Sequence, residues 1–328
     1  MKKSILLLAS IVALAFASCR NANTDEILAS TPSYQKADET SARAELDKSL
    51  DDVDDLLNQT SIGNARTTGV NLPCGVVKFE QDTVTKSYKI VYGKNCGVKI
   101  ISGDITYKLL KGNKFSDKDA VLEVTYTNYK VEYQSSGETI IFNGTHTITN
   151  LTGGGVNNLK TVGTISHKIR GKVDLSFNKT ATKDTTRTWE VFRKRTLTCQ
   201  NGMESTISFK IEGDTSFTKG SKTYNNVAEF GLNKENRDFV NELDTAFVWK
   251  NAGNTWTGPY ILSEGVVTHT TSRPVNSTNV DIIFKAKAGY KLNGINPEYV
   301  GNTTAEGYSL QWTIGAPINI TKSSYQPY

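Results

Sequence analysis

The chain of 328 residues contains little cysteine and histidine, with four and three residues respectively. Four cysteines are too few for a small scaffold held together by many disulfides. Outside the N-terminus, no apolar run approaches the ~18 residues that a membrane-spanning helix needs. The chain also lacks the Gly-x-Ser-x-Gly, His-Glu-x-x-His, calcium-loop and phosphate-loop motifs, so these enzyme and cofactor classes are not indicated, and we expect no cofactor. Hydrophobic residues make up 37% of the chain, which is enough for a folded core and argues against wholesale disorder.

The first nineteen residues have the layout of an export signal. Lys2 and Lys3 precede an apolar segment from Ile5 to Phe16, and small residues follow before Cys19. Residues 16–19 resemble a bacterial lipobox, which implies that Cys19 is acylated after residues 1–18 are removed. Because two or more acyl chains anchor a protein stably, we expect attachment to the bacterial outer membrane without a spanning segment, on its periplasmic or its outer face. The alternative is an ordinary signal peptide cleaved nearby, with Cys19 incidental.

Charge is divided unevenly along the chain. Residues 20–60 carry ten acidic and four basic side chains, whereas residues 61–328 carry 23 acidic and 32 basic ones. A basic body of net charge +9 could favour anionic surfaces such as lipopolysaccharide or acidic glycans. Dispersed lysines that only keep the surface solvated are the alternative. No nucleic-acid-binding module is recognisable, so we expect no nucleic-acid partner.

Hydrophobic periodicity divides the exported part into a tether, a helix and a β body. Residues 19–35 are polar and predict a flexible tether, and residues 36–60 predict an acidic amphipathic helix. Its apolar face consists of Leu46, Leu50, Val53 and Leu57. We expect this face to dock on the domain that follows, with pairing to another chain as the alternative. Residues 61–245 are predicted to form the main β body, and residues 246–328 a C-terminal β region of the same domain or of a second one.

From about residue 66 onward the apolar pattern has a period of two, which is typical of strands. With no helices to make parallel crossovers, these strands predict an all-β fold, an antiparallel sandwich or a curved meander. A helical or loop excursion is expected over residues 233–243. The predicted strands cover residues 75–80, 87–92, 103–110, 121–133, 138–149, 160–177, 186–198, 204–211, 266–271, 279–286 and 308–314.

Cys74 and Cys96 lie symmetrically about residue 85, which falls in the turn of a predicted hairpin. Antiparallel pairing would bring them opposite each other, so they are candidates for a disulfide in an oxidising envelope. Cys199 is then a remaining thiol, expected to be a small buried hydrophobic residue.

These cysteines carry a resemblance to a family of Bacteroidota envelope lipoproteins. The similarity runs through residues 74–79, 85–96, 142–150 and 187–189 and covers about residues 70–200. Members characteristically show a cysteine, a strand, Thr-Ile-Thr-Ile-Asp-Phe-Gly and a second cysteine. This chain has Val91 and Lys94-Asn95 where the family prefers Asp and Asp-Gly, so no role of those acids carries over. The resemblance implies an exported β protein and assigns no activity.

The same lineage attaches O-glycans at Asp-Ser/Thr-apolar/Thr sequences in exported proteins. By that resemblance Thr83, Thr185 and Thr245 are candidate glycosylation sites, each following an aspartate. Unmodified turns are the alternative reading of all three.

Two groups of residues are candidates for ligand contacts. His146 and His167 lie on either side of the predicted turn at residues 153–158 and could make half of a metal site, although no third ligand is identifiable and ordinary strand residues are the alternative. Trp249, Trp256 and Tyr260 cluster in one segment and could stack on sugar rings or anchor a partner; core packing is the alternative.

Together these features predict a lipid-anchored envelope protein whose β body binds or scaffolds a glycan, a lipid or a protein without catalysing a reaction. One alternative is an envelope glycan hydrolase with unrecognised Asp or Glu catalysts. The other is a carrier whose curved sheet encloses an apolar ligand.

Overall fold

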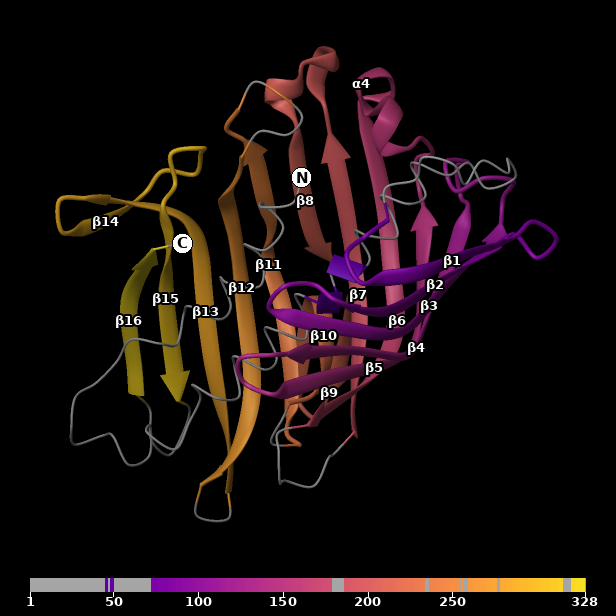
Figure 1. Ribbon diagram of the computed structural model, residues 1–328. Coiled ribbons are helices and arrows are strands. Elements are labelled where there is room, and N and C mark those ends of the chain that lie inside the picture. Colours follow the sequence, from indigo (N-terminus) through magenta and orange to yellow (C-terminus); the bar gives the residue numbers. More distant parts are fainter. Residues whose placement is uncertain are drawn as a thin grey trace. The chain divides into compact units, whose positions relative to one another are not determined.

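The computed structural model describes residues 45–46, 48–49, 72–178, 186–233, 236–253, 255, 259–275, 278–314 and 320–327. It confirms the all-β class, with antiparallel strands throughout (Figure 1). The chain divides into two compact units, which we call the N-terminal unit (residues 45–197) and the C-terminal unit (residues 198–328). Among the described residues, no helix has the length and apolar character needed to cross a membrane.

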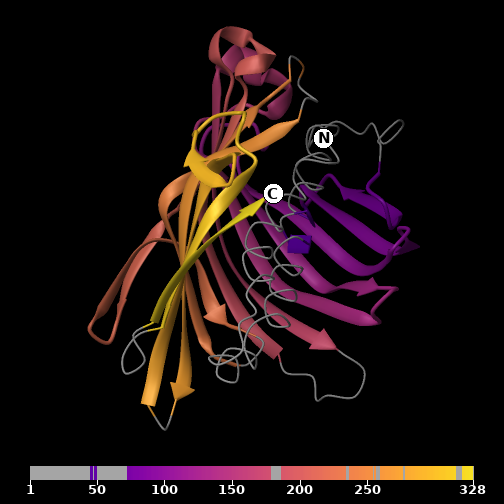
Figure 2. The same cartoon turned by 90° about the vertical axis from the view of Figure 1, so that its left-hand side faces the viewer.

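The N-terminal unit is a meander in which each strand pairs antiparallel with the next one along the chain. Figures 1 and 2 show this order as a steady change of colour from indigo to pink. Its strands are β1 (Val76–Asp82), β2 (Ser87–Asn95), β3 (Lys99–Lys111), β4 (Val121–Tyr133), β5 (Glu138–Asn150), β6 (Thr164–Asn178) and β7 (Thr186–Thr198).

Alternation of buried and part-exposed side chains explains why these segments form strands. In β4, Leu122, Val124 and Tyr126 are buried on one face, and their neighbours are partly exposed. A bulge after Tyr126 inserts Asn128 at φ 47°, a conformation that asparagine tolerates, and the buried face resumes at Tyr129. Aromatic rings then pack across strands on this face, as Tyr88 does on Tyr107 with ring centroids 5.0 Å apart.

The connection between β5 and β6 differs from the prediction. A strand was expected from residue 160, but residues Val156–Asn158 form a 3-10 turn (η1) and Leu159–Val162 a single helical turn (α4). Gly163 ends this turn at φ 75°, so β6 begins only at Thr164.

Four residues of the predicted acidic helix are described, and they contact the N-terminal sheet. Glu45, Leu46, Lys48 and Ser49 are helical, and Leu46 is buried. Glu45 forms an ion pair with Lys99 and accepts a hydrogen bond from the Tyr133 hydroxyl at 3.0 Å. These contacts agree with the expectation that the helix docks on the following domain. Leu50, Val53 and Leu57 lie outside the described residues.

The C-terminal unit has a less regular strand order. Strands β10, β11, β12, β13, β15 and β16 are successive neighbours, while β8 pairs with β11, β9 with β10 and β14 with β13. Two 3-10 turns, η2 (Gln200–Gly202) and η3 (Glu204–Thr206), precede β8. The strands are β8 (Ser208–Gly213), β9 (Thr215–Lys219), β10 (Lys222–Leu232), β11 (Asp238–Asn251), β12 (Tyr260–Val275), β13 (Thr278–Asn293), β14 (Asn296–Tyr299), β15 (Gly307–Ile314) and β16 (Ile320–Pro327).

Two predictions for this half of the chain need correction. The expected excursion over residues 233–243 is only a short connection, because β11 already begins at Asp238. The predicted boundary between residues 245 and 246 would cut β11 in its middle. The two compact units are instead divided between residues 197 and 198.

Candidate functional site

The predicted disulfide is present. Cys74 and Cys96 are bonded with their Cα atoms 5.8 Å apart, next to the paired ends of β1 and β2. The turn between these strands contains the candidate Thr83, which is exposed. Asp82 accepts hydrogen bonds from the backbone N–H groups of Val84 and Thr85, and hydrogen bonding from Thr85 is the main cause that lowers the pKa of its carboxyl. The turn is therefore both well ordered by hydrogen bonds and accessible to a modifying enzyme.

The other glycosylation and lipidation candidates fall in different settings. Thr245 is exposed at an irregular part of β11. Its neighbour Asp244 accepts a hydrogen bond from Thr268 at 3.0 Å and pairs with Lys285 at 2.7 Å, so this aspartate holds three strands together. Thr185 and Cys19 lie outside the described residues.

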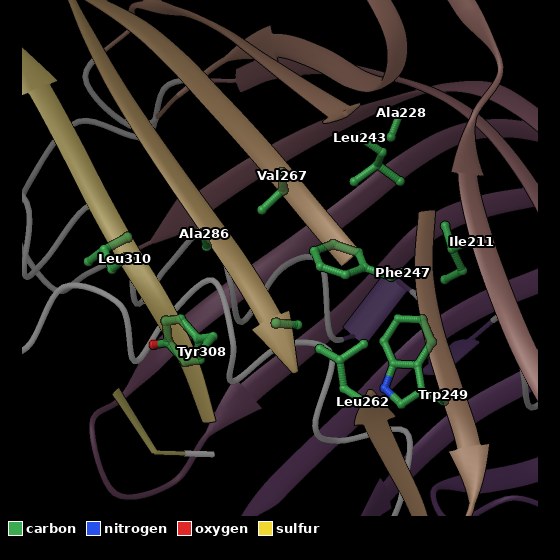
Figure 3. Packing of buried hydrophobic residues seen from close by; sticks show 11 residues of the cluster. Ile211, Ala228, Leu243, Phe247, Trp249, Leu262, Val267, Ala286, Tyr308 and Leu310 are labelled. Atoms are coloured by element: carbon green, nitrogen blue, oxygen red, sulfur yellow. The ribbon is translucent and has the colours of Figure 1, made fainter. Parts of the chain in front are cut away.

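Trp249 lies in the core and not on a binding surface. It is 3% exposed and packs against Phe209 and Phe247, with ring centroids 5.6 and 5.8 Å away. In Figure 3 it lies with Phe247 and Leu262 among the buried side chains of the C-terminal unit. Trp249 is therefore a core residue, which was the alternative to ligand binding. No face of its indole is available to stack on a sugar.

Tyr260 is half-buried and packs against the same cluster, whereas Trp256 lies outside the described residues. Burial, with smaller contributions from Cys199 and Glu204, raises the pKa of Tyr260 to about 12. Cys199 itself is a buried free thiol, as expected, and donates to the Met203 carbonyl at 3.4 Å. Trp249 and Tyr260, the two described members of this aromatic segment, thus pack against the core and do not form a ligand-binding surface.

His146 and His167 do not form half of a metal site. They share the buried face, but His146 is paired with Gly171 and His167 with Asn150, an offset of four residues, which is about 13 Å along a strand. Among the described residues, no group of three or more His, Cys, Asp or Glu side chains could hold a metal ion.

His146 is nevertheless unusual, because it is fully buried and neither ring nitrogen has a hydrogen-bond partner. Its imidazole lies over Gly171, where even an added Cβ would overlap the ring. Desolvation, assisted by the positive charge of Arg193, lowers its pKa to about 3. His167 is also buried, and desolvation lowers its pKa to about 4. Both rings are therefore neutral near pH 7.

In the C-terminal unit, a polar row that was not predicted from the sequence crosses three strands. Glu229, Asn241 and His269 occupy paired positions on β10, β11 and β12. The Asn241 side-chain amide donates to Glu229 Oε1 at 2.5 Å, and its Oδ1 lies 2.6 Å from His269 Nδ1. Because that oxygen can only accept, His269 carries its proton on Nδ1. Three residues far apart in sequence gave no motif, since only the strand register aligns them.

Among the large apolar side chains that the structure describes, the most exposed one lies at the end of the β13–β14 hairpin. We call residues 290–299 the hairpin wing. Residues 292–299 are all exposed, and Ile295 at the turn is 93% exposed. Tyr290 pairs with Tyr299 and Leu292 with Pro297, so the apolar side chains share one face of the hairpin, while Lys291 and Glu298 are paired on the other.

A scan against protein-family models, a search of curated proteins and a search of solved structures each returned no match to this chain.

Three features described above are candidates for a functional role: the disulfide-linked β1–β2 hairpin, the buried polar groups and the hairpin wing. The buried His146 and His167 lie within a sheet face and stay neutral, and the partly buried His269 belongs to a hydrogen-bonded row. Of these three described features, the hairpin wing is the one that presents a set of apolar side chains outward. Asn293-Gly294 is a turn dipeptide that could have indicated this hairpin from the sequence, but exposure of its apolar face is visible only in three dimensions.

Proposed function

We propose that this chain is a lipid-anchored cell-envelope protein whose β body serves as a non-catalytic binding or scaffolding module. The export and lipobox-like pattern of residues 1–19 supports the anchor. The observation that supports binding is the hairpin wing, where Leu292, Ile295 and Tyr299 are all substantially exposed.

Such exposure favours a contact function because it is costly without one. Turn positions normally carry Gly, Asn, Asp or Ser. Exposing an isoleucine side chain to water at a hairpin tip is unfavourable in free energy. Single exposed apolar residues are ordinary, but a contiguous set on one face commonly marks an interaction site. The partner class in this proposal is a glycan, a lipid or a protein of the envelope.

Metabolic labelling with an alkyne fatty acid tests the anchor. We expect the wild-type chain to incorporate the label and Cys19→Ser to lose it. Cys199→Ala is the matched control, because it removes a buried thiol and leaves the proposed acylation site intact. Equal labelling of Cys19→Ser and the wild type would overturn acylation at Cys19.

Binding is tested with the intact lipoprotein against envelope glycans, lipid vesicles and crosslinked envelope proteins. The double variant Leu292→Asn, Ile295→Asn should lose the interaction found for the wild type. Val84→Asn is its control, since Val84 is 90% exposed at the tip of another hairpin. Failure of the wild-type chain to bind in all three screens would overturn the binding role.

A further inference from the structure

The hairpin wing has a graded order of side chains from its tip to its base. Ile295 lies at the tip, Leu292 and Pro297 form the first pair behind it, and Tyr290 and Tyr299 form the pair behind those. The two tyrosine rings meet edge to face with centroids 5.6 Å apart. Aliphatic side chains therefore occupy the outermost part of the hairpin, with phenol rings behind them.

A lysine completes this order at the base of the wing. Lys287 Nζ lies 4.1 Å from the centroid of the Tyr299 ring and 5.7 Å from that of Tyr290. These cation–π contacts hold the ammonium beside the aromatic pair, and no carboxylate is paired with Lys287 among the described residues. The charge is thus positioned on the apolar side of the wing and is available to an anionic group.

By contrast, the charged residues of the opposite face already have partners. Lys291 pairs with Glu306 at 3.3 Å, and Glu298 accepts a hydrogen bond from Asn293 at 3.4 Å. The two faces of the hairpin therefore differ in character. One is apolar, with an ammonium that pairs with no carboxylate among the described residues, and the other carries polar groups that have hydrogen-bond or ion-pair partners.

We propose that the hairpin wing inserts its apolar face into the interfacial region of a lipid bilayer. From the tip to the base of the wing, the side chains are first aliphatic, then aromatic, then an ammonium. This order follows the depth profile of a membrane interface, where aliphatic groups reach the acyl chains, tyrosine rings lie at headgroup level and lysine reaches lipid phosphate. This inference rests on the proposed function, because an acyl anchor would keep the wing at high local concentration near the membrane.

The order of the residues favours lipid over the other partners considered. A glycan site would present a flat aromatic face as its outermost feature, whereas here an aliphatic side chain is outermost and the tyrosines meet edge to face. A protein partner would need a complementary groove for Ile295, and that possibility becomes an outcome of the experiment.

Depth measurement by spin labelling tests the proposal on the full, acylated chain. A nitroxide is attached at Ile295→Cys in protein reconstituted into vesicles of phosphatidylethanolamine and phosphatidylglycerol. Cys199 is buried and the other two described cysteines are bonded, so the label goes to the introduced thiol. Val84→Cys serves as the matched control because it is an equally exposed apolar residue at a hairpin tip.

If the proposal holds, the accessibility of the label at residue 295 to oxygen, relative to a water-soluble nickel complex, rises severalfold upon reconstitution, while the label at residue 84 stays water-like. A label at Leu292→Cys should show a smaller rise, since it lies behind the tip. A water-like signal at residue 295 overturns the proposal. Loss of access to both reagents also overturns it, because that result indicates a protein partner or self-association.

Co-flotation with the vesicles separates this proposal from the proposed function. Protein that floats through its acyl chains but shows a water-like label at residue 295 retains the anchor and loses only the insertion of the wing. Protein that neither floats nor shows a change at residue 295 contradicts both.

Discussion

Each unit of this protein buries polar side chains on a sheet face, and one position in each shows an opposite way of accommodating them. In the N-terminal unit, His146 is fully buried with no hydrogen-bond partner for its ring, and desolvation keeps it neutral. In the C-terminal unit, Glu229, Asn241 and His269 form a hydrogen-bonded row across adjacent strands. A neutral, unpartnered imidazole costs stability when it must be protonated, whereas a paired row costs stability when one member is removed. The stability of one position is therefore expected to depend on pH, and that of the other on an intact hydrogen-bonded row.

The units also differ in strand pairing and in covalent cross-linking. The N-terminal meander joins only sequence neighbours and carries a disulfide that links the chain on either side of its first hairpin. The C-terminal unit places β8 beside β11 and adds the projecting β13–β14 hairpin, and its described cysteine is a free thiol. Stability should therefore respond to different perturbations in the two units.

The largest expected effect is truncation of the core tryptophan of each unit. Trp189 is 1% exposed and Trp249 is 3% exposed, so Trp189→Ala and Trp249→Ala should each lower the free energy of unfolding by about 3–5 kcal/mol. Urea unfolding followed by far-UV circular dichroism measures the loss. The Trp→Phe variants are controls that should lose less.

Hydrogen exchange then tests whether the units are separate. Trp189→Ala should weaken protection mainly in β1–β7, and Trp249→Ala mainly in the C-terminal strands. Uniform loss of protection in both variants would show that the units are not separate, since the chain would then open as a single cooperative body.

Removal of the disulfide should have the next largest effect. The bond closes a loop with a sequence separation of 22, so the double variant Cys74→Ala, Cys96→Ala should lose about 3 kcal/mol on the chain-entropy description. Thermal unfolding with and without reductant measures this. The wild type and the Cys199→Ala control should respond to reductant, and the double variant should not. Weakened protection of β12 and β13 in the double variant would contradict a local role for the bond.

Much of the N-terminal unit could be predicted because its information is local. Strands over residues 121–133 and 186–198 were predicted with the bounds that the structure has, since alternation runs through both. The cysteine pair followed from hairpin symmetry alone. Even the bulge in β4 left the pattern readable, because two exposed residues interrupt the alternation and the same face then resumes.

The C-terminal unit was harder because irregular register breaks the alternation. Strand β11 pairs with β12 through three register shifts, and β10 is bulged against β11 and against β9. Strands β9, β10 and β11 were accordingly missed. The same irregularity hid which face of β11 is buried, so Trp249 was a candidate for the surface. The polar row of Glu229, Asn241 and His269 depends on these registers and could not be read from spacing.

The pH response provides a smaller and more specific test of the buried histidines. An unfolded histidine binds a proton below about pH 6.5, whereas folding lowers the pKa of His146 to about 3 and that of His167 to about 4. The unfolded state thus binds more protons between these values, and the free energy of unfolding should fall with decreasing pH by about 1.4 kcal/mol per unit for each histidine. Urea unfolding from pH 7 to pH 4.5 measures this slope. His146→Phe should lower this slope by the contribution of one proton, and an unchanged slope would show that His146 does not contribute.

The smallest expected effect concerns the helical residues at the start of the N-terminal unit. Ser49 Oγ donates to the Leu46 carbonyl at 2.7 Å, so the Tyr126 hydroxyl, 2.9 Å from the same oxygen, is the donor of the second hydrogen bond. A double-mutant cycle of Ser49→Ala and Tyr126→Phe should give a coupling of about 1 kcal/mol in urea unfolding. The cycle separates this contact from the cost of leaving either group unpaired, because the double variant removes both. Zero coupling would mean that the helix does not rest on β4 in solution, and the N-terminal unit would then begin at β1.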